Sequence, residues 1–218
     1  MSTATVVIDG ITFSLGNRKL GGIPSVSLLP KLTCGKFCGG PLLCRRDCYA
    51  ERMQQYTSVE PSWRRNAMNA LKDSNLVTHA VSLFLAKRKP PFFRWHVGGD
   101  IPSEGYLLGM LRLAKAFPMT KFRCFTKAYE LLPKTHPRIP NLSIGISRWP
   151  GMPVPKGLRG YTYSWIVPNP KSSACLAGRL SDRDYRVPRN ALNCPGSCEN
   201  CRICWTAPAG THMKFKQH

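Results

Sequence analysis

The chain has 218 residues, which suits one domain with a sizeable hydrophobic core, or one domain with a small appendage. A hydrophobic content of 43% excludes an intrinsically disordered chain, and no apolar run approaches the about 20 residues that a membrane helix needs. The formal net charge of +21 is typical of proteins that contact a polyanion, usually nucleic acid. The basic residues are scattered along the chain, which weakens the case for one dedicated nucleic-acid groove.

Ten cysteines are the strongest signal in the composition. The first residues, 1–5, lack the basic and then apolar pattern of a signal peptide, so we expect a cytoplasmic protein with no membrane partner. Disulfides rarely persist in the cytosol, so clustered cysteines there indicate a metal site.

The first half of the chain predicts a hairpin followed by helices. Two β-rich runs within residues 5–15 flank Asp9-Gly10, a strong turn signal. A short apolar segment, Val26 to Leu29, then leads into the first cysteines. Residues 49–57 are predicted to be helical, and residues 61–86 to form one long helix or two short ones.

After residue 91 the pattern alternates between strands and helices. We predict strands at 92–97, 121–126, 142–147 and 160–167, a helix capped by Ser103 that runs to Phe117, and a short helix at 128–132. Alternation with connections of this length predicts an α/β fold with a parallel sheet, either a small irregular sheet or a partial, open βα barrel. We expect one compact domain: an N-terminal hairpin (1–22), a core with a cysteine-rich loop (23–190), and a cysteine-rich C-terminal tail (191–218).

Eight of the cysteines form two dense groups. The first is Cys34, Cys38, Cys44 and Cys48, separated by three, five and three residues, and the second is Cys194, Cys198, Cys201 and Cys204, separated by three, two and two. Structural zinc sites usually place two pairs of ligands well apart. Four cysteines within eleven residues, as in the second group, better suit a 4Fe–4S cluster, in which each cysteine binds a different iron atom.

Several alternatives remain open from spacing alone. Zinc could occupy either group, and the two groups could hold one cluster each or share a single one. Cys124 and Cys175 stand alone, as expected of small buried hydrophobic residues. Tyr49 and Trp205 follow the last cysteine of each group, where an aromatic ring could shield a cluster or belong to an ordinary core.

Three further segments carry a family resemblance. The run from Lys31 to Ala50, the motif Arg94-Trp95-His96-Val97-Gly98-Gly99-Asp100, and Phe122 to Lys127, together with the terminal cysteines, resemble the phage "gene product eighty-eight" family. That family is similar to radical S-adenosylmethionine (SAM) enzymes. The resemblance covers most of residues 25–205 and implies a phage protein in the host cytoplasm, with a fold like a degenerate radical SAM core.

The resemblance also implies a cofactor-binding segment at Gly98, Gly99 and Asp100. In radical SAM enzymes a similar glycine-rich segment holds the amino group of the methionine moiety, and a carboxylate suits an ammonium. The alternative is a tight strand-to-helix turn in which Asp100 caps the next helix. His96 is expected to be a core histidine with satisfied hydrogen bonds, and Lys127 either faces the same end of the sheet or is solvated.

The cysteine pattern departs from that of radical SAM enzymes, which use Cys-x3-Cys-x2-Cys near the first strand and leave one iron open. Cys44 comes too late in the first group, and Cys48 adds a fourth thiol. The second group has the required spacing at the opposite end of the chain, where Asn200 replaces the usual aromatic residue and Cys204 could close the cluster.

Three hypotheses follow. The first is an iron–sulfur protein on a radical-SAM-like scaffold, where the cluster has a redox or structural role and a redox partner can be involved. The second is an active radical SAM enzyme that binds S-adenosylmethionine. The third is a zinc-stabilised nucleic-acid-binding protein. We favour the first because the dense cysteine spacing suits a 4Fe–4S cluster better than zinc, and because a fully ligated cluster cannot activate SAM at iron but can transfer electrons or act structurally.

Overall fold

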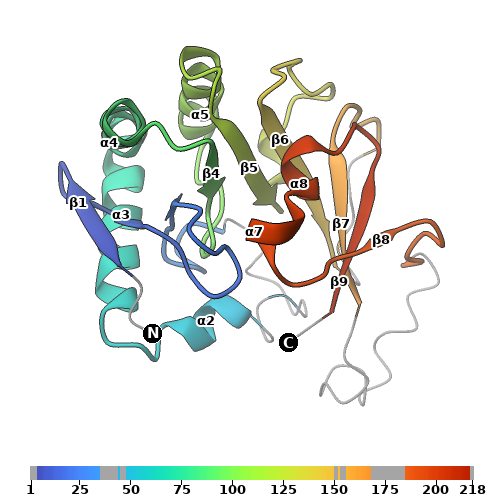
Figure 1. Cartoon of the computed structure of the whole chain (residues 1–218), viewed down its shortest axis with the longest axis horizontal. Coiled ribbons are helices and arrows are strands. Elements are labelled where there is room, and N and C mark those ends of the chain that lie inside the picture. The colour runs from blue at the N-terminus through green and yellow to red at the C-terminus, as the bar shows by residue number, and fades with distance from the viewer. Residues whose placement is uncertain are drawn as a thin grey trace.

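The computed structural model describes residues 4–34, 44, 48–149, 152, 156–167 and 185–216. Its centre is a nine-stranded sheet with the order β1-β2-β3-β4-β5-β6-β7-β9-β8 (Figure 1). All pairings from β3 to β8 are parallel, and only those of the N-terminal strands β1, β2 and β3 with one another are antiparallel. The α/β class and the parallel sheet predicted from the sequence are thereby confirmed.

The N-terminal hairpin forms as predicted. Strands β1 (Thr5–Ile8) and β2 (Ile11–Ser14) pair antiparallel around Asp9 and Gly10, whose φ angles are 46° and 75°. A two-residue turn of this kind needs a positive φ at both central positions, which favours Asp-Gly. Strand β3 (Ser25–Val26) then joins the hairpin to the parallel part of the sheet.

Helices cover one face of the sheet. Helix α2 (Tyr49–Met53) ends earlier than predicted, and the region predicted as one or two helices forms two, α3 (Val59–Lys72) and α4 (Ser74–Arg88). The break occurs at Asp73, which has extended backbone and accepts a hydrogen bond from the N–H of Asn75 to cap α4. Helices α3, α4 and α5 lie together beside the N-terminal part of the sheet (Figure 1).

The central strands alternate with further helical segments. Strand β4 (Phe92–Trp95) is followed by α5 (Glu104–Ala116), whose N-cap Ser103 accepts from the N–H of Tyr106 as predicted. The next elements are β5 (Lys121–Thr126), the 3-10 turn η2 (Tyr129–Leu131), β6 (Leu142–Arg148) and β7 (Thr162–Val167). The four strands agree with the predicted ones to within about two residues at each end.

The C-terminal segment, predicted as a cysteine-rich tail, adds two strands to the sheet. It contains β8 (Leu192–Asn193), the short helices α7 (Cys198–Cys201) and α8 (Ile203–Thr206), and β9 (His212–Lys216). Strand β9 lies between β7 and β8 and runs parallel to both. Because the chain turns back to form β9, α7 and α8 lie over the sheet face opposite the helices α3–α5 (Figure 1).

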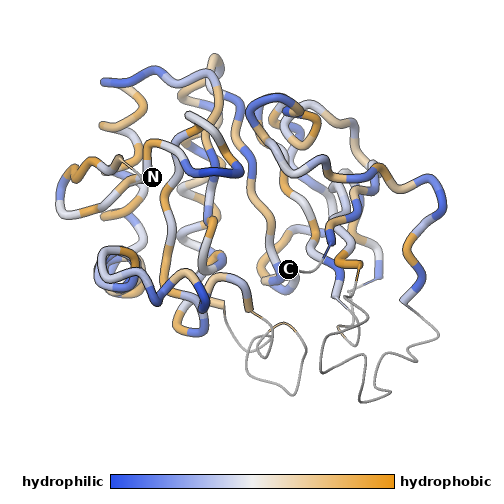
Figure 2. The backbone as a smooth tube through the Cα atoms, turned by 60° about the horizontal axis from the view of Figure 1, so that its bottom comes forward, coloured by the Kyte–Doolittle hydropathy of each residue, from blue (hydrophilic) through white to orange (hydrophobic). Residues whose placement is uncertain are grey.

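The two faces of the sheet differ in character. On the helical face, Phe93 and Trp95 pack against Phe84 of α4 and Tyr106 of α5 in an apolar core. Figure 2 shows hydrophobic and hydrophilic residues interleaved along the whole chain, and no helix in the described part is long and apolar enough to cross a membrane. The opposite face, beneath α7 and α8, is polar and holds the candidate site.

Buried Asn66 fastens the hairpin to the helical layer. Its side chain accepts a hydrogen bond from the N–H of Thr12 (2.9 Å) and donates to the carbonyls of Thr12 (2.8 Å) and Ser27 (3.0 Å). All of these side-chain and backbone groups lie in the protein interior, where unpaired polar groups are costly. Asn66 therefore fixes the position of β2 relative to α3.

Candidate metal centre on the polar face of the sheet

Two arginines occupy equivalent positions on neighbouring strands and face the polar side of the sheet. Arg94 in β4 and Arg123 in β5 are 8% and 0% exposed, and their Cα atoms are register partners. Side chains at equivalent register positions of adjacent strands point to the same face, so both guanidinium groups lie beneath the cysteine-rich segment. Arginines are almost never this buried unless an anion pairs with them.

The guanidinium of Arg123 has polar contacts on one side only. Its Nη1 donates to the hydroxyls of Ser143 and Thr162, the latter at 2.8 Å. Its Nε and Nη2 are buried and have no hydrogen-bond partner in the described part of the chain. Burial lowers the pKa of Arg123 to about 10. Space for the group exists because position 145 is glycine: a Cβ there would lie 2.3 Å from Nη2.

Arg94 is held by backbone and by an aromatic ring. Its guanidinium donates to the carbonyl of His96 (Nη2 to O, 3.2 Å) and lies 4.1 Å from the ring centroid of Phe125, which also contacts Arg123 at 4.0 Å. His96 has a φ of 54°, an unusual backbone conformation for a residue with a side chain. Neither Arg94 nor Arg123 forms an ion pair with a carboxylate in the part of the chain described.

Two thiols of the second cysteine group, Cys198 and Cys204, interact electrostatically with these arginines. Burial raises the pKa of Cys204, while the positive charges of Arg123 and Arg94 act to lower it. Burial likewise raises the pKa of Cys198, opposed by Arg94 and Lys19. Each of these thiols also interacts electrostatically with Cys194. The arrangement is a set of thiols beside buried cations, in which the positive charges of the arginines oppose the effect of burial on the thiol pKa values.

A small apolar cluster anchors the second cysteine group. Trp205 is buried with Leu20 and Ile23, and its indole Nε1 donates to the carbonyl of Phe93 at 3.3 Å. The N–H of Cys198 donates to the carbonyl of Lys19 at 2.7 Å. Trp205 is thus a core residue that attaches α8 to the sheet, the second of the two roles expected for it.

Of the first cysteine group, the structure describes Cys34, Cys44 and Cys48, while Cys38 falls outside the described residues. Cys44 is buried, and Cys34 and Cys48 are half-buried. Burial alone would lower the pKa of Lys127, but Cys44, Asp100 and Cys34 reverse this and raise it. The sequence left two alternatives for Lys127, a side chain that faces the site end of the sheet or one that is solvated. The structure agrees with the first, because Lys127 interacts with Cys34 and Cys44 of the first cysteine group.

The Gly98-Gly99-Asp100 segment packs closely against Trp63 and forms hydrogen bonds to the end of β5. A Cβ at Gly98 would lie 2.2 Å from the ring of Trp63, and Gly99 has a φ of 78°. The carboxylate of Asp100 accepts from the N–H of Lys127 (2.7 Å), the N–H of Ile101 (2.8 Å) and the hydroxyl of Thr126 (2.6 Å). Asp100 therefore joins the ends of β4 and β5. The cap of α5 is Ser103, not Asp100.

The isolated residues behave as core. His96 is 2% exposed, its Nε2 lies 3.0 Å from the hydroxyl of Tyr106, and burial lowers its pKa to about 3. Cys124 is fully buried, 3.9 Å from Nδ1 of His96. Cys175 lies outside the described residues.

A cavity of about 240 Å³ connects the two sites. Its lining includes Asp100 and Lys127 near the first cysteine group, and Arg94, Cys198 and Cys204 near the second. Among the residues that the structure describes, no three His, Cys, Asp or Glu side chains lie close enough together to hold a metal ion. Two other features therefore bear on metal binding: the cysteine thiols, and the two buried arginines that form no ion pair with a carboxylate in the described part of the chain.

The buried arginines were missed by the sequence analysis, although a signal was present. Arg94 and Arg123 each interrupt a strand that is otherwise aromatic or apolar, Phe-Phe-Arg-Trp and Phe-Arg-Cys-Phe. A charge at a position that strand periodicity makes inward-facing indicates a buried partner of opposite charge. That inference requires knowing which strand face carries the cysteines, and this depends on the fold.

Comparison with known proteins gives one match. The model of the family described as gene product 88 matches residues 11–207, a range that contains both cysteine groups and both arginines. No curated protein and no solved structure matches the chain. The match agrees with the resemblance drawn from the sequence motifs and fits a phage origin. Because it covers most of the chain, the protein belongs to the gene product 88 family.

Proposed function

We propose that the chain is an iron–sulfur protein in which the second cysteine group, Cys194 to Cys204, ligates a 4Fe–4S cluster on the polar face of the sheet. The first group, Cys34 to Cys48, is the candidate for a second cluster. In this proposal the sheet is an open βα barrel related to the radical SAM scaffold. The clusters transfer electrons or stabilise the fold.

The observation that carries the proposal is the pair of buried guanidinium groups beside the second cysteine group. An unpaired buried charge is strongly destabilising, so Arg94 and Arg123 require an anion. Four thiolates around a cluster core leave about two negative charges at the centre. The bare Nε and Nη2 of Arg123 are suited to donate to sulfur there.

Ligand spacing, not charge, favours iron over zinc. A zinc ion with four thiolates would carry a similar negative charge, so the arginines suit both. The four cysteines of the second group lie within eleven residues, on α7, α8 and the turn before them. Zinc sites usually draw paired ligands from two separate segments, whereas ferredoxin-type clusters use runs of closely spaced cysteines.

The scaffold part of the proposal rests on the sheet and its site edge. The parallel strands β4, β5 and β6 have helices on one face and the polar site on the other, and Lys127 at the carboxyl end of β5 interacts with Cys34 and Cys44 of the first cysteine group. Ligand sites of open parallel α/β sheets occupy that edge. An active radical SAM enzyme is supported less well, because the oxygens of Asp100 already accept three hydrogen bonds from the protein.

Paired cysteine substitutions test the proposal. We expect the double variant Cys198→Ser/Cys204→Ser, purified without oxygen, to lose the iron and acid-labile sulfide of the second site. Cys124→Ala is the matched control, because it removes a buried thiol that belongs to neither group, and it should retain the iron of the unchanged chain. Circular dichroism shows whether each variant is folded.

Two results would overturn the proposal. One is a native protein that contains stoichiometric zinc and no iron. The other is an iron content that Cys124→Ala and the double variant reduce equally, which would point to a loss of folding. Reductive cleavage of S-adenosylmethionine by the reduced protein would instead establish the radical SAM enzyme.

A further inference from the structure

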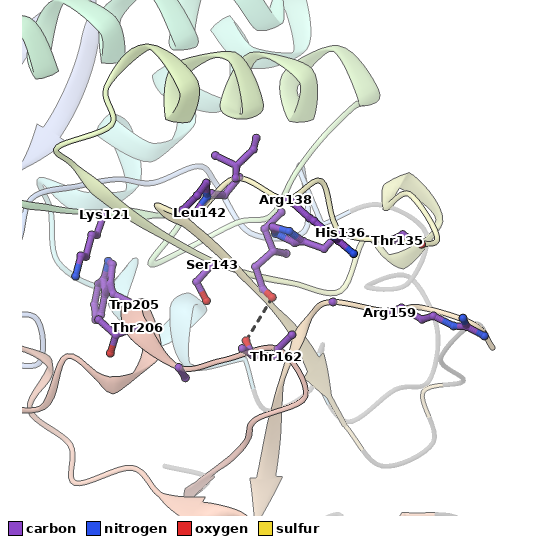
Figure 3. A pocket seen from close by; sticks show the side chains of 16 residues that line it. Lys121, Thr135, His136, Arg138, Leu142, Ser143, Arg159, Thr162, Trp205 and Thr206 are labelled. Atoms are coloured by element: carbon purple, nitrogen blue, oxygen red, sulfur yellow. Dashed lines mark hydrogen bonds between the residues drawn. The ribbon is translucent and has the colours of Figure 1, made fainter.

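A second and larger cavity lies at the opposite edge of the sheet. It has a volume of about 780 Å³ and is lined by residues from the amino ends of β5, β6 and β7, from the loop before β6, and from α8 and the residues after it. Figure 3 shows Lys121, Trp205 and Thr206 on one side of this cavity and His136 and Arg138 on the other, with Ser143 and Thr162 between them.

The polar groups of this cavity are hydrogen-bond donors and cations. Lys121 and Arg138 are exposed at its border, and the hydroxyls of Ser143, Thr162 and Thr206 belong to its lining. No aspartate or glutamate occurs among the described residues that line it. His136 does not add charge, because burial lowers its pKa and keeps the ring neutral.

Arg123 forms hydrogen bonds to two of the hydroxyl groups that line the cavity, those of Ser143 and Thr162. The guanidinium, which is fully buried, donates to both through Nη1. A hydroxyl oxygen that accepts from a guanidinium directs its own hydrogen away from that group. The hydrogen of Thr162 goes to the carbonyl of Ile144 (3.3 Å), and that of Ser143 can be donated to a ligand. The positive charge of Arg123 makes Ser143 a better donor to an anion.

Much of the rest of the lining is apolar, and the cavity is too large for an inorganic anion alone. Ile139, Pro140, Ala207 and Ala209 form part of it. Cavities of roughly 300–1,000 Å³ with mostly apolar walls and a few convergent polar groups are typical of small-molecule sites. The chemistry thus matches an anion attached to an organic body.

We propose that this cavity binds a small phosphorylated organic molecule of mononucleotide size. Its phosphate contacts Lys121, Ser143 and Thr206, and its organic body lies against Ile139 and the alanines after α8. No cysteine lines this cavity in the described part of the chain, although Arg123 and α8 lie close to both this cavity and the second cysteine group. The binding of such a ligand does not depend on which metal the cysteines hold.

Calorimetric titration of the purified full chain with adenosine 5′-monophosphate tests the proposal, with adenosine as the probe that lacks phosphate. We expect the nucleotide to bind at least about tenfold more tightly than adenosine, because its phosphate accepts charge-assisted hydrogen bonds that adenosine cannot accept. Lys121→Gln and Ser143→Ala should each weaken nucleotide binding about fivefold or more. Lys115→Gln, an exposed lysine of α5 outside the cavity, should leave it unchanged.

Three outcomes would overturn the proposal. The first is equal affinity for adenosine and the nucleotide, since the phosphate would then contribute nothing. The second is an equal effect of Lys121→Gln and Lys115→Gln, which would indicate general surface charge. The third is binding of a single-stranded oligonucleotide with no binding of the mononucleotide, which would make the partner a nucleic acid. Circular dichroism of each variant excludes loss of folding as the cause.

Discussion

Replacing Arg123 with methionine should change the stability of the protein in opposite directions with and without the cluster. In the proposed iron–sulfur protein the guanidinium faces the negative charge of a cluster on the second cysteine group, and its removal leaves that charge without its partner. In the double variant Cys198→Ser/Cys204→Ser, which lacks the cluster, the same guanidinium has no anion. There the substitution removes an uncompensated buried charge.

The magnitude follows from the burial of Arg123. Its pKa falls from the ordinary 12.5 to about 10 in the protein. At about 1.36 kcal/mol per pKa unit, this shift corresponds to a cost of about 3 kcal/mol for keeping the buried group charged. Removing one partner of a buried charge pair costs roughly 3–5 kcal/mol. We therefore expect Arg123→Met to destabilise the native protein by about 3 kcal/mol and to leave the cluster-free variant unchanged or more stable.

Thermal unfolding followed by circular dichroism under anaerobic conditions measures the difference. For a chain of this size, about 3 kcal/mol corresponds to a change of roughly 6–12 °C in Tm. Arg112→Met, which removes an exposed arginine of α5, is the control and should have little effect in either background. Gly145→Ala offers a second test, because its Cβ would displace the Arg123 side chain without removing the charge.

Equal Tm changes in the two backgrounds would refute the reasoning. They would mean that the hydroxyls of Ser143 and Thr162 satisfy Arg123 by themselves. The need for an anionic centre beside it would then disappear, and with it the main support for a cluster on the second cysteine group.

Three other substitutions test the fold around the site. Asn66→Ala removes three buried hydrogen bonds to backbone and should lower the free energy of urea unfolding by about 3 kcal/mol. Asn69→Ala, which removes one hydrogen bond of a half-buried side chain within α3, should change it by less than about 0.5 kcal/mol. Gly98→Ala places a methyl group 2.2 Å from the Trp63 ring, so little folded protein should be recovered; normal yield and Tm would contradict the packing. His96, with a pKa of about 3, stays neutral in the folded protein but is protonated on unfolding below pH 6.5. Between pH 6.5 and 5 the wild type should therefore lose about 2 kcal/mol of stability relative to His96→Gln. Parallel pH profiles of stability for the two proteins would disprove this.

Local patterns predicted much of the fold. The Asp9-Gly10 turn, the Ser103 cap and the strands on either side of α5 depend on short-range preferences, and the structure agrees with them. The position of β9 was not predictable in the same way. It pairs with β7 across a long intervening segment, and such pairings are decided by tertiary packing rather than by the residues of the strand itself.

The candidate site was predicted in part. The cysteine spacing identified the thiols, and the parallel sheet implied a site at its carboxyl edge. The Gly98-Gly99-Asp100 motif resembles a ligand-binding segment, and in the fold the carboxylate of Asp100 accepts hydrogen bonds from Thr126 and Lys127 at the end of β5. The buried cations became visible only with the fold, because strand register decides that Arg94 and Arg123 share a face with the cysteines.

X-ray absorption spectroscopy at the iron edge, on protein purified without oxygen, tests the central claim most directly. The account predicts iron surrounded by sulfur, with further iron atoms in the next shell, and the loss of this signal in the Cys198→Ser/Cys204→Ser variant. An absent iron edge, or iron bound by nitrogen and oxygen alone, would contradict it.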